Sequence, residues 1–346
     1  GVIAGLGSVL VFLPQITILF AFILLLEDSG YLPRAAFLLD NLMAKSGLSG
    51  RSFIPLLSSF ACAVPAVMSA RTINDPRERL VTIAVAPLLT CSARLPVYAL
   101  IIAAVIPNRT VGGIFNLQGL TLFILYLAGI LSAALAAYIM KRLARMKGNV
   151  QQFPLLMELP TFRTPNFKHI MTSLWDRVKA FLKRAGTIIF ALAVVLWGLV
   201  SWPQPPAGAT GAAIDYSLAG MLGHAIQPLF APLGFTWEMC IAMIPGIAAR
   251  EVVVAALGTV YAVSASSEDA VQNALIPIVH NNWGLPTAFA FLAWYVYAPM
   301  CAATLAVIKR ETKSTKNMVM ITGYLFLMAY FAAFVVYQIS SRILSS

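Results

Sequence analysis

Three of the four cysteines in this sequence stand beside prolines inside apolar stretches, where a helix would be broken. The neighbours are Pro65 for Cys62, Pro87 and Pro96 for Cys91, and Pro299 for Cys301. Thiolates are soft ligands that suit Cu(I), Zn(II) and Fe(II), and the thioether of Met300 adjoins Cys301. Any one of these cysteines alone is well explained as a small packing residue, as we interpret Cys240. Three of them beside breaks favour a transition-metal pathway.

Charged residues inside apolar stretches form the second set of candidates. Glu27 and Asp28 close the first apolar segment, either as an interfacial acidic pair or as a collector of cations. The adjacent Arg250 and Glu251 fall in the middle of a later segment, either as a self-neutralising structural pair or as part of a gate. We therefore take Glu27, Asp28 and Glu251, together with Met300, as auxiliary residues of the metal site.

Signatures of catalysis are absent from the sequence. His169, His224 and His280 are scattered and show no zinc-binding spacing. There is no phosphate-binding loop and no nucleophile elbow. The cysteines form neither a C-x-x-C pair nor an extracellular disulfide pattern. We expect neither an enzyme with catalytic residues, nor a disulfide framework, nor a permanently bound cofactor.

The elements that must position the candidate residues are membrane helices. Of the 346 residues, 60% are hydrophobic and only 11% are charged. Apolar segments near the roughly 20 residues that a bilayer helix needs recur along the chain. They run over 9–26, 52–70, 80–106, 117–140, 185–202, 237–262, 286–308 and 317–340. The net charge of +11 comes from short clusters between these segments, a positive-inside pattern rather than a nucleic-acid surface. The sequence predicts an all-α polytopic membrane protein.

The charges of the loops predict that two segments do not cross the membrane. The basic loops are 34–51, 71–79, 141–184 and 309–316, and we place all of them in the cytoplasm. Segment 52–70 then leaves and returns on the same side, so it is re-entrant. By the same parity, 237–262 is re-entrant from the outer side, where its flanking loops lack Lys and Arg. Pro65, Pro245 and Gly246 interrupt these two segments and are the expected hinges.

The two halves of the chain therefore follow one plan, with three spanning helices and one re-entrant broken-helix hairpin in each. Residues 1–147 form the first repeat and 185–346 the second, which is inverted because three spans are an odd number. Residues 148–184 are expected to be a cytoplasmic amphipathic linker. The sequence begins at Gly1 without a signal peptide, so we expect a fragment of a longer protein.

Long stretches of the sequence closely resemble the membrane region of the bacterial ferrous iron transport protein B (FeoB) family. They are "VFLPQITILFAFILLLEDSGYLPRAAFLLDNLM", "SFIPLLSSFACAVPAVMSARTI", "PLLTCSARLPVYALIIAAVIP", "IPGIAAREVVVAALGTVYA" and "YAPMCAATLAVIKRET". The resemblance implies that the two broken regions are the family's paired gates. It also implies that Cys62, Cys91 and Cys301 fall at cysteine positions proposed to handle Fe(II).

The resemblance further implies a permease core that moves Fe²⁺ into the cytoplasm across the bacterial inner membrane. Family members carry an N-terminal GTPase domain that regulates transport, and GTP with Mg²⁺ would bind only there. The expected partners are Fe²⁺ as substrate, the lipid bilayer, that GTPase domain, small cytoplasmic Feo accessory proteins and further copies of the chain, with no nucleic acid. The alternative is a transporter of an organic solute such as a nucleoside, because similar gates also suit anions at helix N-termini. An intramembrane enzyme would need a catalytic dyad that the sequence lacks.

Overall fold

The computed structural model describes most of the chain. The described residues are 14, 17–18, 20–26, 28–45, 48–111, 115–145, 164–183, 187, 191, 194–195, 198–199, 202–203, 216–248, 250, 252–261 and 268–345.

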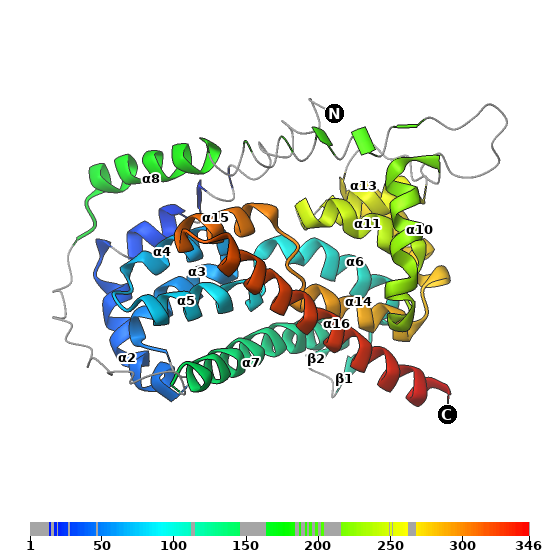
Figure 1. Ribbon diagram of the computed structural model, residues 1–346, viewed down its shortest axis with the longest axis horizontal. Coiled ribbons are helices and arrows are strands. Elements are labelled where there is room, and N and C mark those ends of the chain that lie inside the picture. Colours follow the sequence, from blue (N-terminus) through cyan, green and yellow to red (C-terminus); the bar gives the residue numbers. More distant parts are fainter. Residues whose placement is uncertain are drawn as a thin grey trace.

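Helices make up nearly all of the described structure, which confirms the all-α class (Figure 1). The α-helices before residue 200 are α2 (Tyr31–Lys45), α3 (Phe53–Ala61), α4 (Ala63–Ser69), α5 (Pro76–Val85), α6 (Leu95–Val105), α7 (Leu117–Arg145) and α8 (Phe167–Phe181). Those after it are α10 (Leu218–Phe230), α11 (Trp237–Ala248), α12 (Val252–Val260), α13 (Glu268–Asn282), α14 (Leu285–Tyr297), α15 (Ala302–Thr312) and α16 (Thr315–Ser345). Short 3₁₀ helices are η1 (Gly50–Ser52), η2 (Ala70–Thr72), η3 (Ala86–Leu88), η4 (Ser92–Arg94) and η7 (Ala231–Leu233). The exception is a small antiparallel hairpin of β1 (Thr110–Val111) and β2 (Phe115–Asn116).

Three described helical segments are long and apolar enough to cross a bilayer, and they agree with the predicted spans 80–106, 117–140 and 317–340. They are Pro76–Val105, Leu117–Leu143 and Thr315–Ile343. The predicted span 286–308 consists of α14 and α15 with an extended stretch between them. The spans predicted at 9–26 and 185–202 lie only partly within the described residues. The chain is a multi-pass membrane protein.

The segment Pro76–Val105 is broken in its middle and is also the most enclosed of the three. Its backbone leaves the helix between η3 and η4, at residues 89–91. In its most apolar stretch 67% of the residues are buried, against 22% in each of the two unbroken segments. Broken backbone is tolerated at membrane depth only where protein covers it. Burial therefore separates a central broken segment from peripheral continuous ones.

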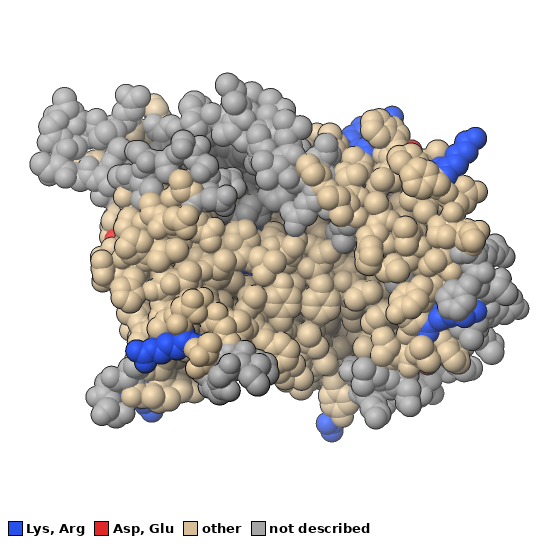
Figure 2. Space-filling model, turned by 180° about the vertical axis from the view of Figure 1, so that it is seen from behind, with Lys and Arg blue, Asp and Glu red and all other residues tan. Residues whose placement is uncertain are grey.

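Two apolar cores stabilise the bundle. The larger joins α6, α10, α11, α12, α13, α14 and α16. Within it Trp294 packs edge to face against Phe230 and Phe235, whose rings stack on each other. The second joins α4, α5, η3, α7, α15 and α16. Figure 2 shows one outer face on which the Lys and Arg side chains lie mostly toward the edges, and most of the coloured surface between them is uncharged. A broad uncharged belt is what a lipid-facing surface requires.

Loops that the sequence predicts to be cytoplasmic meet at one end of the bundle. Arg71 donates from Nε and Nη2 to the two carboxylate oxygens of Glu311, each at 2.5 Å. The backbone N–H of Ser49 donates to the carboxylate of Glu78. The loops 34–51, 71–79 and 309–316 are therefore in contact. In Figure 1 the C-terminal end of α7 lies near α2 on one side, and the β1–β2 hairpin and the C-terminus lie on the other.

Candidate functional site

Three of the four cysteines lie in breaks between helices. Cys62 separates α3 from α4, Cys91 directly precedes η4, and Cys301 directly precedes α15. Backbone N–H groups at a helix start lack intrahelical acceptors and carry partial positive charge. Such a position favours a negatively charged ligand atom. Cys240 differs, because it lies inside α11, is 1% exposed and packs in the larger apolar core.

The breaks at Cys91 and Cys301 contact the guanidinium of Arg250, which is itself in the break between α11 and α12. Its Nη1 donates to the Sγ of Cys91 at 3.4 Å. Its Nε donates to the carbonyl oxygen of Met300, the neighbour of Cys301, at 2.9 Å. The break at Cys62 adjoins the break at Cys91, because Ser92 Oγ donates to the carbonyl oxygen of Ala61 at 2.9 Å. Side chains far apart in the sequence thus form one cluster, which we call the break cluster: Cys62, Cys91, Arg250 and Cys301. Cys91 and Arg250 are buried, whereas Cys62 and Cys301 are half-buried.

The thiols of the break cluster are not arranged as a finished metal site. Among the described residues, no group of three or more His, Cys, Asp or Glu side chains could hold a metal ion. The Sγ of Cys301 accepts a hydrogen bond from Thr304 Oγ1 at 3.1 Å. Cys62 and Cys301 both border a small apolar cluster of Phe20, Val64 and Ala303. Coordination by all three thiols would require them to move closer together.

The auxiliary residues have separate environments. Met300 is 3% exposed and contributes its carbonyl oxygen to Arg250. Asp28 accepts from the backbone N–H of Asn166 at 2.7 Å and lies 3.8 Å from His169 Nδ1, so it anchors the start of α8. Glu27 and Glu251 lie outside the described residues.

The proline and glycine hinges expected in the two gates lie within helices, next to the breaks. Pro65 is in the first turn of α4, three residues after Cys62. The missing N–H of a proline costs little in a first turn, since that group lacks an intrahelical acceptor there. Pro245 and Gly246 lie inside α11, and the helix continues to Ala248.

Arg94 is a structural residue of the site whose contacts the sequence does not reveal. It is fully buried, and it donates to the carbonyl oxygens of Pro87 at 3.0 Å and Leu89 at 3.2 Å, with a longer contact to Leu88 at 3.4 Å. These carbonyls are the ones that the break before Cys91 removes from the helix. An arginine inside an apolar segment, a few residues after a proline, is the signal that could have indicated this role.

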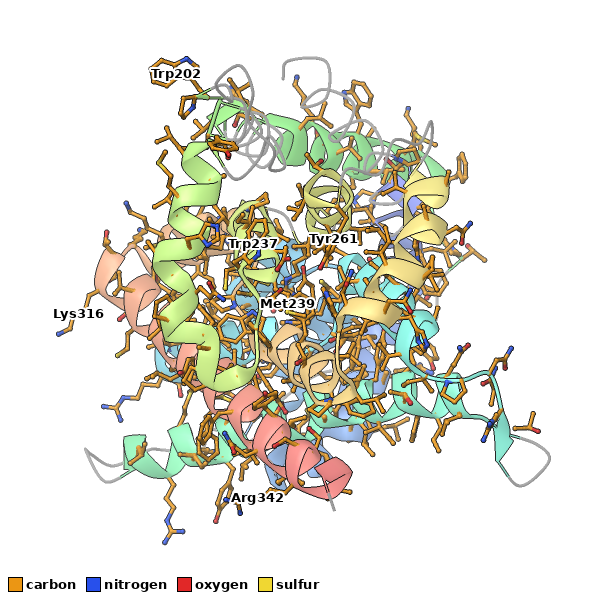
Figure 3. All side chains as sticks on the ribbon, turned by 90° about the vertical axis from the view of Figure 1, so that its right-hand side faces the viewer. Trp202, Trp237, Met239, Tyr261, Lys316 and Arg342 are labelled. Carbon is orange, nitrogen blue, oxygen red and sulfur yellow. The ribbon has the colours of Figure 1, made fainter. Side chains whose placement is uncertain are left out.

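Figure 3 gives the setting of this region within the bundle. Met239, 0% exposed, lies in the crowded middle, whereas Lys316 and Arg342 near the two ends of α16 point outward. Trp237 stacks on His224 at 4.9 Å between ring centroids, and Tyr261 accepts from Trp283 Nε1 at 3.0 Å. His280 Nδ1 lies 2.7 Å from the carbonyl oxygen of Ala104. These particular aromatic and histidine side chains therefore have partners other than the thiols.

Comparison with protein families identifies the chain. The family model described as "Gate: Nucleoside recognition" matches residues 9–105 and 182–315, well over half of the sequence. The model described as "Ferrous iron transport protein B C terminus" matches residues 122–177. The chain belongs to the gate-domain family of FeoB proteins. All four residues of the break cluster fall within the matched gate segments.

Curated FeoB relatives align with almost the whole chain. The Fe(2+) transporter FeoB of Leptospira interrogans serovar copenhageni is 42% identical over 353 residues, covering 98% of this chain and 50% of the relative. That of Leptospira biflexa is 40% identical over 347 residues, with coverage of 98% and 50%. That of Staphylococcus aureus strain COL is 40% identical over 340 residues, with coverage of 98% and 48%. The chain spans about half the length of the curated relatives it matches. No solved structure matches the chain.

Proposed function

We propose that this chain is the permease core of a ferrous iron importer, which moves Fe²⁺ into the cytoplasm along a route that passes Cys62, Cys91 and Cys301. The observation that carries the proposal is the position of these thiols: each stands in a helix break, and the breaks converge. Soft sulfur ligands at interrupted backbone suit transient binding of a transition metal. The FeoB relatives, which are named Fe(2+) transporters, support the same substrate.

In this proposal the two gates are the helix pairs α3–α4 and α11–α12. Each pair consists of short helices that pack against each other across a break, at Cys62 in the first and around Arg250 in the second. We propose that α3–α4 enters from the cytoplasm and α11–α12 from the outer side, as the loop charges predict. Residues 1–147 and 185–346 would then be inverted repeats joined by the linker 148–184, with Pro65, Pro245 and Gly246 easing movement of the gates.

We propose that a GTPase domain outside this chain regulates transport, as the family resemblance implies, and the relatives, about twice as long as this chain, leave room for one. We propose the bacterial inner membrane as the location, with small cytoplasmic Feo proteins and further copies of the chain as partners. Glu27, Asp28, Glu251 and Met300 would assist the passage of Fe²⁺. In this reading the chain transports rather than catalyses.

A nucleoside or related organic solute is the second candidate. The description of the matched gate family, nucleoside recognition, favours it. The two readings differ in their need for sulfur. A nucleoside site requires hydrogen-bonding partners for bases and sugars, whereas the break cluster presents three thiols. Loss of the thiols would therefore impair Fe²⁺ transport but leave binding of a nucleoside largely unchanged.

Serine substitution of the break cysteines tests the iron route. Replacing Cys62, Cys91 or Cys301 by serine keeps the size of the side chain but removes the soft ligand. Each variant of the complete protein should lose Fe²⁺ uptake by about tenfold or more, because even outer partners of metal ligands are worth roughly 10–100-fold. Uptake of radioactive Fe²⁺ is measured in cells that lack other ferrous importers, with membrane abundance as a reference.

Cys240→Ser is the matched control, since Cys240 packs inside α11, and it should transport like the wild type. Wild-type rates in all three break variants would make those cysteines packing residues. The iron route would then have to use carbonyl and carboxylate oxygens.

Cysteine labelling tests the re-entrant gates. In a protein whose native cysteines are replaced by serine, Ser49→Cys and Asn74→Cys flank α3–α4 and should both react with an impermeant maleimide from the cytoplasmic face. Asn282→Cys, at the end of α13, should react only from the outer face. Reaction of the Ser49 and Asn74 positions from opposite faces would mean that 52–70 crosses the membrane.

A further inference from the structure

Four breaks meet in the break cluster, but only three of them supply a thiol. Cys62 occupies the break between α3 and α4, Cys91 the one before η4, and Cys301 the one before α15. Arg250 occupies the corresponding position between α11 and α12. Where a fourth ligand for a metal ion would be expected, the chain places a permanent cation.

The guanidinium of Arg250 is held firmly in that position. It is 3% exposed and donates to Cys91 Sγ at 3.4 Å, to the carbonyl oxygen of Met300 at 2.9 Å and, at the limit of bonding distance, to that of Ala298 at 3.5 Å. Tyr295 fixes the backbone of the break by donating its hydroxyl to the carbonyl oxygen of Arg250 at 2.9 Å. Within the described part of the chain, no carboxylate pairs with this guanidinium.

A buried cation beside a sulfur ligand opposes the entry of a second cation. Coulomb repulsion between like charges is strong where water is excluded, and it doubles for a divalent ion. Arg94, a second buried arginine, lies beside the break at Cys91, where it donates to the carbonyl oxygen of Leu89 at 3.2 Å. An Fe²⁺ ion that approaches the thiol of Cys91 would therefore be repelled by the positive charges of these two buried arginines.

We infer that Arg250 is a tethered cation that closes the route. Its guanidinium occupies the position beside Cys91 that Fe²⁺ must take. Fe²⁺ can pass only when the break between α11 and α12 moves and takes the guanidinium away from Cys91. The carbonyls of Met300 and Ala298 bind the guanidinium in the closed arrangement. This inference rests on the proposed iron route, and it assigns to Arg250 the control of that route.

Charge-selective modification of Cys91 tests the position of the cation without measuring transport. The complete protein keeps Cys91 and carries Cys62→Ser, Cys240→Ser and Cys301→Ser. Its reaction rates are measured with two methanethiosulfonates of similar size, one bearing an ammonium group and one a sulfonate. The ratio of the two rates cancels the intrinsic reactivity of the thiol. With arginine at position 250 the anionic reagent should react faster.

Arg250→Gln should raise the ratio of cationic to anionic rate by at least tenfold, because it removes the charge beside Cys91. Arg250→Lys keeps the charge and should keep a ratio close to that of the parent protein. An unchanged ratio in Arg250→Gln would overturn the inference. If Arg250→Gln does not fold, Tyr295→Phe releases the backbone of the same break, and it should raise the ratio in the same direction. An unchanged ratio in that variant would also overturn the inference.

Transport separates this inference from the proposed function. Arg250→Gln, with all cysteines present, should admit Fe²⁺ into proteoliposomes without GTP at several times the wild-type rate, and Arg109→Gln on an exposed loop should not. If the wild type takes up no Fe²⁺, or if the cysteine variants transport normally, the proposed function fails, whereas the reagent ratio still reports on Arg250. If the wild type transports through the thiols but Arg250→Gln admits no Fe²⁺ without GTP, Arg250 is not the closing element.

Discussion

Arg94→Leu should destabilise the protein by about 3 kcal/mol, one of the largest single-residue losses expected in this chain. The side chain bonds to the carbonyl oxygens of Pro87 and Leu89, and leucine offers no donor to replace it. An unpaired carbonyl at membrane depth has no water to bond with, and each one costs about 1–3 kcal/mol. Leucine also removes the cost of burying a charged guanidinium, which is a stabilising contribution. The net loss of stability is therefore smaller than the summed cost of the unpaired carbonyls.

Two quantities are measured on the detergent-solubilised protein: its thermal midpoint of unfolding, and its folded yield by size-exclusion chromatography. Arg94→Gln keeps one donor group and should fall between leucine and the wild type. Arg109→Leu removes an arginine from an exposed loop and serves as the control, with a change within about 0.5 kcal/mol. Normal stability of Arg94→Leu would mean that water or another donor reaches the carbonyls of this break.

The sequence predicts the breaks well because proline and charge patterns are local signals. Cys91 and Cys301 follow Pro87 and Pro299 in apolar segments, and in the structure both are non-helical residues that precede a helix. The long spans also follow from composition. In each case the signal lies within a short stretch of chain.

The partners across the breaks could not be predicted, since they depend on how distant segments pack. The guanidinium of Arg250 bonds to Cys91, 159 residues away, and to the backbone near Cys301, and no local pattern indicates these contacts. The bond between Asp28 and the start of α8 likewise joins segments 138 residues apart. A proline also locates a helix break only approximately, because Pro65 and Pro245 lie inside α4 and α11, near the breaks and not in them.

Gly246→Ala should destabilise the α11–α12 pair by about 1–3 kcal/mol, although alanine normally favours a helix. A Cβ at this position of α11 would lie 2.4 Å from Cγ2 of Val253 on α12 and 2.9 Å from Cε of Met300. The methionine terminus can rotate away, but the β-branched valine is stiff, so α12 must shift. Since the break at Arg250 lies between these helices, the same shift should alter Fe²⁺ uptake.

Gly323→Ala on α16 is the matched control for this change. No atom lies within 4 Å of its added Cβ, so alanine should stabilise that helix by about 0.5–1 kcal/mol. Two glycine-to-alanine changes in helices should thus shift the thermal midpoint in opposite directions. The cause is tested by adding Val253→Ala, which removes the methyl group that the new Cβ would strike. The double variant should then lose less unfolding free energy than the two single variants lose in sum. Simple additivity of Gly246→Ala and Val253→Ala would show that close approach of α12 is not the reason for glycine at this position.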